Sequence, residues 1–305
     1  EALRCPIMSR NCWRMLKRLA RLSRNIETFI GCESEYEDAD IVIFGAPFDS
    51  TTSYRPGTRF AAKAMRSESF GIETYSPYQD RDLSDSRIFD AGDLELCFGD
   101  PKPALDAIKE FTAKILDDRK LPVMIGGEHL VTLGALTAAA ERWDDLHIIH
   151  FDAHADLRDD YLGAKLSHAA VMRRVWELVG DDRIFQFGIR SGDKTEFVWA
   201  KEHVRMIKFN FSGLDNAVDF LKGKPVYLSI DLDVLDPSEF PGTGTPEAGG
   251  VSFSELLNAI FKVSKLNIVG CDINELCPVY DQSGISTAMA CKILRELLLA
   301  LGRKK

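Results

Sequence analysis

The sequence predicts an α/β protein built on a parallel sheet. From about residue 40 onward, short apolar runs rich in Val, Ile and Phe alternate with longer segments whose apolar residues recur every three or four positions. The short runs are hydrophobic on both faces, which is typical of strands that are covered by helices on both sides. This alternation indicates βαβ units, and no internal boundary interrupts it.

Eight apolar runs are the expected strands, and five periodic segments are the expected helices. The strands lie at residues 41–47, 87–92, 121–127, 146–154, 183–190, 204–209, 226–233 and 267–274. The helices lie at residues 102–118, 130–143, 167–180, 253–264 and 286–302. Such units either close into a barrel or form an open doubly wound sheet, and periodicity does not separate the two. In both, functional residues belong at the carboxyl ends of the strands.

Composition and charge narrow the class of protein. The chain has 305 residues, 45% hydrophobic and 28% charged, which suits one large globular domain. A net charge of −9 argues against nucleic acid as the partner. No apolar run approaches the ~18 residues of a membrane span, so no membrane partner is expected. Seven Cys without a CxxC pair are typical of free thiols in a reducing compartment, so we expect a cytoplasmic protein.

The first 24 residues differ in charge from the rest of the chain. They hold seven Lys or Arg and one Glu, and they lack the apolar core of a secretory signal. We expect residues 1–24 to be a basic extension that can form a helix, and residues 25–305 to form a single catalytic domain. A transit-like segment, a membrane-surface helix and a non-native extension are the alternatives for residues 1–24.

Three of the expected strands end in clusters of potential metal ligands. The motifs are MIGGEH, HFDAHAD and SIDLDVLDP. Alternate residues of an extended segment share a face, so the carboxylates and imidazoles within each motif can point the same way. The six candidate ligands are His129, Asp152, His154, Asp156, Asp231 and Asp233.

Four carboxylates gathered in one pocket predict bound cations. Carboxylates that share a low-dielectric site repel one another and tend to protonate unless positive charge compensates them. Two divalent ions would balance the four charges, and bridging carboxylates would hold the ions roughly 3.5–4 Å apart. Mixed His and carboxylate ligands without a thiolate favour Mn²⁺ over structural zinc, although Co²⁺, Fe²⁺ or Ni²⁺ could substitute.

Together, the segments GGEH, FDAHAD, SHAAVMRR and SIDLDVLDPSEFPGTGTPEAGG resemble the ureohydrolases, the arginase/agmatinase family of dinuclear manganese enzymes. The resemblance runs from about Asn25 to the C-terminus. It implies a three-layer α/β/α fold around an eight-stranded, mainly parallel open sheet. It also implies a homo-oligomer, commonly a trimer or hexamer, and hydrolysis of a guanidino group to urea and an amine by a metal-bridging hydroxide.

The resemblance implies a role for each ligand motif and for two further residues. One Mn²⁺ is expected on His129, Asp152, Asp156 and Asp231, and the other on His154, Asp152, Asp231 and Asp233. Asp156 is also expected to pass a proton to the leaving amine. His168 falls where the family has a proton-shuttle histidine. Glu275 matches the carboxylate that binds the substrate guanidinium.

Within the family, GAPFDSTTSYRPGTRF, PGTGTPEAGG and CPVYD resemble agmatinases, which predicts the small cationic substrate agmatine and the products putrescine and urea. Arginases have an Asn where this chain has Arg158, so recognition of an amino-acid head is not expected. Arg158 is nevertheless a candidate substrate-binding residue, and Asp193 and Glu196 are candidates for contact with the far end of the substrate. Thr245 is expected to line the pocket.

Other functions stay open at this point. The same chemistry could act on guanidinobutyrate, arginine or formiminoglutamate. A non-catalytic metal-binding regulator would be expected to have a degraded ligand set, whereas all six ligand types are present here. Two-metal phosphoester hydrolysis would need Arg or Lys near the metals, and only Arg158 qualifies.

Three further residues lie beside the ligand motifs. His150 shares the ligand-facing side of its strand, but we expect a buried, hydrogen-bonded strand histidine rather than a ligand. Glu128 could orient a ligand from behind. For Asp272 the sequence leaves open a supporting contact or a strand-end cap.

Overall fold

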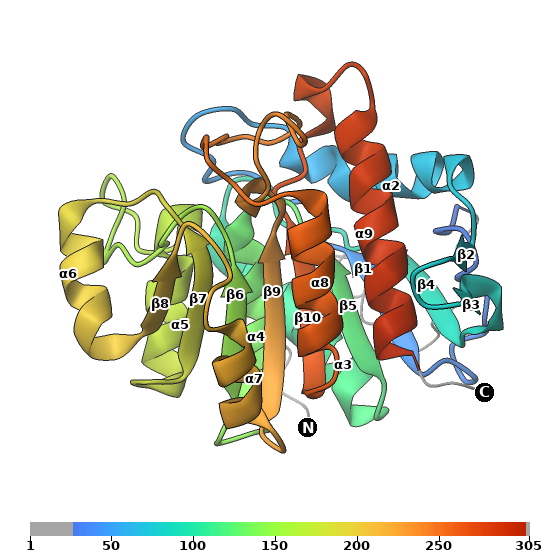
Figure 1. Cartoon of the computed structure of the whole chain (residues 1–305), viewed down its shortest axis with the longest axis horizontal. Helices are drawn as coiled ribbons and strands as arrows, with labels where there is room; N and C mark the ends of the chain where they lie inside the picture. Colours follow the sequence, from blue (N-terminus) through green and yellow to red (C-terminus); the bar gives the residue numbers. More distant parts are fainter. Residues whose placement is uncertain (1–26, 303–305) are drawn as a thin grey trace, which may run out of the picture.

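The structure, a computed structural model, describes residues 27–302 and contains one eight-stranded sheet (Figure 1). Its strands are β1 (Ile41–Gly45), β4 (Ile88–Asp93), β5 (Leu121–Ile125), β6 (His147–Phe151), β7 (Ile184–Ile189), β8 (Arg205–Lys208), β9 (Pro225–Asp231) and β10 (Asn267–Asn274). The order is β4-β1-β5-β10-β9-β6-β7-β8, and these pairings are all parallel. The order begins at one edge and ends at another, so the sheet is open rather than a closed barrel. Each strand overlaps a predicted run.

Helices cover both faces of the sheet and give three layers (Figure 1). One face is covered by α3 (Pro101–Asp117), α4 (Thr132–Ala140) and α5 (Val171–Val179). The other face is covered by α2 (Ala61–Glu68), α7 (Leu214–Leu221), α8 (Phe253–Val263) and α9 (Ile285–Leu301). The buried apolar residues accordingly fall into two clusters, one on each side of the sheet. This arrangement explains why the strands are apolar on both faces.

Four central strands end at predicted site residues. In the order β5-β10-β9-β6, each strand is followed at its carboxyl end by a predicted site residue. After β5 the chain crosses β10 and β9 to form β6, so successive strands continue into opposite halves of the sheet. Such a switch point leaves a crevice at the carboxyl ends of the strands, and ligands bind there in open α/β sheets.

Three helices, α2, α6 (Lys194–His203) and α7, lie outside the set that periodicity predicted. They are eight to ten residues long, and α2 and α7 have no side-chain N-cap to mark where they begin. A short antiparallel pair, β2 (Tyr75–Ser76) and β3 (Arg81–Asp82), was likewise not predicted. The helix expected in residues 1–24 lies outside the described residues.

The Gly126–Gly127 pair after β5 permits a close approach of backbone segments. A Cβ atom at Gly127 would collide with the backbone of Phe48, and one at Gly126 would collide with the Asn274 side chain. The chain can therefore leave β5 tightly and bring the following residues over the end of the sheet. Among the described residues, no helix is long and apolar enough to cross a membrane.

Candidate metal centre and active site

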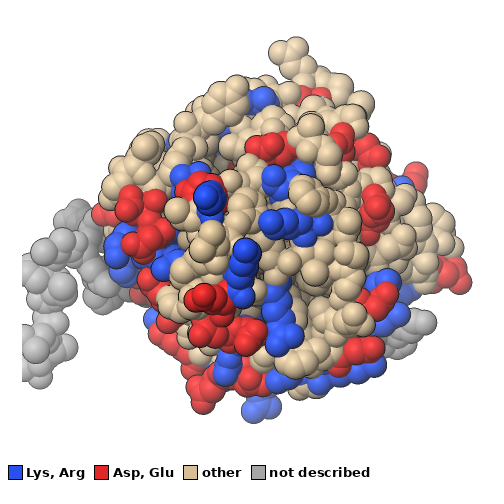
Figure 2. All heavy atoms as spheres, turned by 60° about the vertical axis from the view of Figure 1, so that its left-hand side comes forward, with Lys and Arg blue, Asp and Glu red and all other residues tan. Residues whose placement is uncertain are grey.

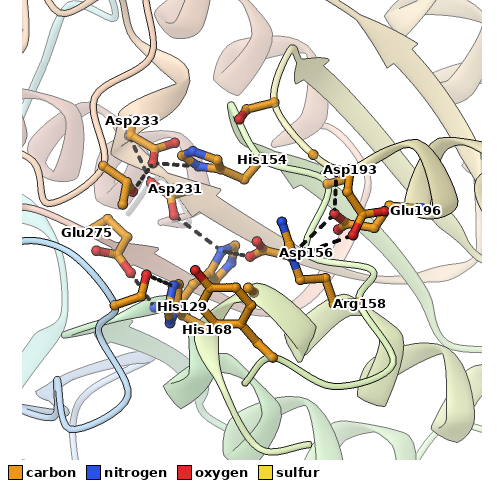
Figure 3. A pocket seen from close by; sticks show the side chains of 17 residues that line it. His129, His154, Asp156, Arg158, His168, Asp193, Glu196, Asp231, Asp233 and Glu275 are labelled. Atoms are coloured by element: carbon orange, nitrogen blue, oxygen red, sulfur yellow. Dashed lines mark hydrogen bonds and ion pairs between the residues drawn. The ribbon is translucent and has the colours of Figure 1, made fainter. Parts of the chain in front are cut away.

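A pocket of about 270 Å³ opens at the carboxyl ends of the central strands, and Figure 3 shows its lining. Eleven of the twelve predicted site residues line this pocket, and the remaining one, Asp152, is fully buried against them. The predicted residues that line the pocket are, in chain order, His129, His154, Asp156, Arg158, His168, Asp193, Glu196, Asp231, Asp233, Thr245 and Glu275.

 Together with the buried Asp152, these eleven residues make up the full predicted set of twelve. The sheet therefore brings the whole predicted set together.

The backbone aims several of these side chains by local geometry. Asp231 is the last residue of β9, and its Oδ1 accepts a hydrogen bond of 2.8 Å from the backbone N–H of Asp233. Asp156 and Glu275 have φ angles of 56° and 65°. Residues other than Gly rarely adopt this left-handed region, and such conformations cluster at functional sites. The turns after β6 and β10 thus direct both carboxylates back over the sheet.

One cluster of ligand atoms surrounds the imidazole of His129. Its Nδ1 lies 3.1 Å from Asp152 Oδ2, 3.2 Å from Asp156 Oδ2 and 3.3 Å from Asp231 Oδ2. His129 Nδ1 and Asp152 Oδ2 are buried and have no hydrogen-bond partner. Buried polar atoms are almost always satisfied, so orphaned atoms that converge in this way fit a metal ion.

A second cluster lies beside the first and shares a carboxylate with it. His154 Nδ1 lies 3.0 Å from Asp233 Oδ2 and 3.6 Å from Asp152 Oδ1. Ligand atoms of Asp152, His154 and Asp233 lie close enough together to hold an ion, as do those of a second group, which consists of His129, His150, Asp152 and Asp156. Asp152 therefore offers one oxygen to each cluster. This arrangement suits two neighbouring ions with a bridging carboxylate.

The electrostatics of the cluster also favour bound cations. Burial raises the pKa of Asp231 well above its ordinary value, and the neighbouring Asp233 and Asp152 add to the shift. Burial and the Asp152 charge raise the pKa of Asp156 to about 7. Carboxylates in such surroundings stay ionised at neutral pH when divalent ions compensate them.

Neighbouring side chains hold the candidate ligands in position, and one of them, Ser229, was not among the predicted site residues. Ser229 Oγ lies 2.9 Å from His129 Nε2 and donates a 2.7 Å hydrogen bond to Asp272 Oδ1. This contact leaves His129 Nδ1 free to face the carboxylates. His150 is buried, as expected, and its Nε2 lies 2.8 Å from Asp152 Oδ2. Asp272 thus supports the site rather than capping a strand end.

We expect Ser229→Ala to weaken metal binding by about 10- to 100-fold, which is the usual effect of removing a contact that orients a ligand. The substitution removes the hydroxyl between His129 Nε2 and Asp272 but leaves all six candidate ligands in place. Titration of the metal-free protein with Mn²⁺, followed by calorimetry, measures the change. Ser238→Ala, at an exposed hydroxyl bonded to Asp236, is the control. Equal affinities for the two variants would contradict the orienting role.

Glu275 lies at the floor of the pocket next to the first cluster (Figure 3). Its Oε1 accepts a 2.8 Å hydrogen bond from the backbone N–H of His129. Burial raises the pKa of Glu275 well above its ordinary value, with contributions from Asp233 and Glu128. A cationic group bound in the pocket would stabilise the ionised carboxylate.

His168 lies at the pocket wall and is held by the loop after β1. Its backbone N–H donates to Thr51 Oγ1 at 3.2 Å, and its Nε2 lies 3.2 Å from Ser53 Oγ. The Glu128 carboxylate accepts hydrogen bonds from both the backbone N–H and the hydroxyl of Thr51. Glu128 therefore fixes this loop instead of touching a candidate ligand. Burial lowers the pKa of His168 to about 4, so its imidazole is neutral at pH 7.

The remaining predicted residues form the pocket mouth. Arg158 lies between two carboxylates, with its Nη1 3.4 Å from Asp193 Oδ2 and its Nε 3.5 Å from Glu196 Oε2. Asp193 and Glu196 also form the capping box that begins α6. Thr245 Oγ1 donates to Asp233 Oδ2 at 3.2 Å. The pattern Asp-x-x-Glu could have indicated this helix start from the sequence.

Comparison with known proteins agrees with the fold. The Arginase family model matches residues 39–300. The chain belongs to the arginase family. It is 48% identical to the agmatinase of Bacillus subtilis over 277 residues, which cover 90% of this chain and 96% of that protein.

Solved structures of arginase-family proteins share the same fold. A structure from Clostridium difficile has a TM-score of 0.85 and 54% identity, covering 88% of this chain and 98% of that one. The agmatine ureohydrolase of Thermoplasma volcanium has a TM-score of 0.83 and 34% identity, covering 91% and 94%. The chain is accordingly a hydrolase that acts on carbon–nitrogen bonds of guanidino compounds. The family depends on two metal ions, and the His/Asp cluster provides a site of this kind.

Proposed function

We propose that this chain hydrolyses agmatine to putrescine and urea, with two Mn²⁺ ions per subunit. The observation that carries the proposal is the convergence of His129 Nδ1 and three aspartate carboxylates beside the buried carboxylate of Glu275. The six candidate ligands are those named above. The similarity to proteins described as agmatinases supports this choice of substrate.

Each residue of the pocket has a part in the proposed reaction. When bound, the two metal ions supply Lewis-acid activation of water for attack on the guanidinium carbon. Glu275 accepts hydrogen bonds from the guanidinium N–H groups and fixes the orientation of that carbon. Asp156 passes a proton to the leaving amine. His168, which is neutral at pH 7, accepts protons from the site and exchanges them with solvent.

The pocket mouth favours a cationic substrate over an anionic one. Among the residues that line this pocket, Arg158 is the one Lys or Arg, and its guanidinium already lies against two carboxylates. A substrate carboxylate would have to compete with Asp193 and Glu196 for this charge. Guanidinobutyrate and arginine are therefore the second candidates. Hydrolysis of either would indicate that Arg158 binds the substrate carboxylate.

We also propose that residues 25–305 act as one catalytic domain and that the protein is a cytoplasmic homo-oligomer, either a trimer or a hexamer. Five cysteines within the described residues are free thiols, which suits a reducing compartment. Unbroken packing of the sheet between its two helical layers supports the single domain. Light scattering of the purified protein measures the number of subunits.

Urea release from agmatine should require added Mn²⁺ and should disappear on chelation. The test loads the protein with Mn²⁺ and supplies agmatine, arginine, guanidinobutyrate or guanidinopropionate in parallel, with a chelated sample as the control. We expect urea from agmatine, because the mouth lacks an unpaired cation for a substrate carboxylate among the lining residues. Urea from a different guanidino compound would support the proposed reaction but contradict agmatine as the substrate. Metal-loaded protein that releases no urea from any of them would overturn the proposal.

A further inference from the structure

We infer that Glu247 determines specificity, because its carboxylate is placed to bind the terminal ammonium of the substrate at the pocket mouth. The inference rests on the proposed function and extends it to the end of the substrate that does not react. Glu247 lies in the PGTGTPEAGG segment and is not among the site residues that the sequence indicated.

Glu247 lies beside the pocket, and the basic group nearest its carboxylate among the described residues is the His154 imidazole. Its Oε1 accepts a 2.8 Å hydrogen bond from Ser191 Oγ and lies 4.0 Å from His154 Nε2. Ser191 and His154 both line the pocket. Within residues 27–302, Glu247 makes no ion pair with Lys or Arg, and its side chain is 43% exposed. The carboxylate can therefore reach a charged group that enters the mouth.

The nearby Arg190 anchors the Glu247 backbone instead of neutralising its side chain. Its Nε and Nη2 donate to the Glu247 carbonyl at 3.2 and 2.9 Å. The other hydrogen bonds of this guanidinium go to the carbonyls of Gly188, Asp233, Val234 and Leu235. An arginine has five N–H donors, and here they serve backbone carbonyls. The segment is thus rigidly placed while the carboxylate stays available.

The two other carboxylates at the mouth are already engaged. Asp193 Oδ1 accepts hydrogen bonds from the backbone N–H groups of Thr195 and Glu196 at the start of α6. Glu196 accepts from the backbone N–H groups of Asp193 and Leu157 through its two oxygens. Arg158 lies against both of them. A substrate ammonium gains more from Glu247, whose carboxylate pairs with no Lys or Arg among the described residues and lies 4.0 Å from the His154 imidazole.

The segment from Gly244 to Glu247 runs from the expected guanidinium site to the expected ammonium site. A Cβ atom at Gly244 would lie 3.7 Å from Glu275 Oε2, which is the expected guanidinium site. Thr245 lines the pocket, and Glu247 lies at the outer side of His154. Three residues of chain span at most about 10 Å. A guanidinium at Glu275 can therefore place an ammonium, four methylene groups away, near Glu247.

The test compares agmatine with butylguanidine, which lacks the terminal ammonium, in wild-type protein and in Glu247→Gln. For agmatine we expect kcat/KM to fall about tenfold, mainly through KM, because a charge-assisted hydrogen bond is lost. For butylguanidine the same substitution should change kcat/KM by less than about twofold, since no ammonium is present to lose a contact. Glu247→Asp should restore part of the preference for agmatine, because it keeps the charge.

Asp193→Asn tests the competing site for the ammonium, since it removes a carboxylate at the same mouth that is already paired with Arg158. Loss of the agmatine preference in Asp193→Asn but not in Glu247→Gln would overturn the inference. Equal losses for both substrates in Glu247→Gln would also overturn it, because they indicate a structural effect. If the wild type releases no urea from agmatine, the proposed function fails. If it does so and Glu247→Gln keeps the preference, only the inference fails.

Discussion

Replacing Asp231 by Asn should remove bound metal and lower urea release by more than about 100-fold, because we propose that the two metal sites share the charge that is lost. Asp231 is buried, with its Oδ2 3.3 Å from His129 Nδ1 and its Oδ1 bonded to the backbone N–H of Asp233. The amide keeps the shape of the side chain but offers no negative charge. Metal content by mass spectrometry and urea release from agmatine measure the two effects.

Asp215→Asn provides the control for this prediction. Asp215 is an exposed residue of α7 that pairs with Lys262 on the surface, outside the pocket. Its substitution should leave metal content and turnover within about twofold, since exposed ion pairs contribute little. Wild-type turnover by Asp231→Asn with two metal ions retained would contradict the bridging role.

Replacing His168 by Ala should leave both metal ions bound and lower kcat by about 100-fold or more, the usual contribution of a positioned acid–base group. The lowered pKa of about 4 means that the imidazole binds a proton only when the pH falls toward 4. It is therefore neutral throughout pH 7–9.5, and its own titration should not appear in this range. Turnover measured across this range, together with metal content, checks the prediction.

Two further variants separate proton transfer from packing. Ser53→Ala removes the hydroxyl beside His168 Nε2 and should lower kcat less than loss of the imidazole does. His203→Ala removes a histidine that pairs with Asp181 away from the pocket, and should leave kcat unchanged. A His168→Ala enzyme with the wild-type rate at every pH would remove His168 from the proton path.

Sequence patterns predicted the sheet well because its strands are buried on both faces. Each of the eight apolar runs corresponds to a strand, and the five predicted helices correspond to α3, α4, α5, α8 and α9. The short helices α2, α6 and α7 escaped prediction: α2 and α7 have no side-chain N-cap to mark where they begin, and the capping box of α6 was not recognised. Periodicity alone left barrel and open sheet equivalent; the family resemblance pointed to the open sheet, and the strand order confirms it.

The sequence by itself determined which chemical groups meet at the carboxyl ends of the strands. Ligand-type side chains at alternate positions of HFDAHAD and SIDLDVLDP share a face in any extended backbone, so their grouping follows from local geometry. Adjacent parallel strands then place the motifs at one edge of the sheet. This local rule explains why the candidate ligands could be named before the strand order was known.

Only the tertiary structure decided which neighbours hold and complement those groups. Ser229 meets His129 across 100 positions of sequence, and Thr51 meets His168 across 117. Glu247 has its carboxylate at the mouth because Arg190, 57 residues earlier, fixes its backbone. Strand periodicity records which face a side chain occupies, whereas these contacts depend on strand order and on loop conformations. No local repeat in the sequence encodes either of them.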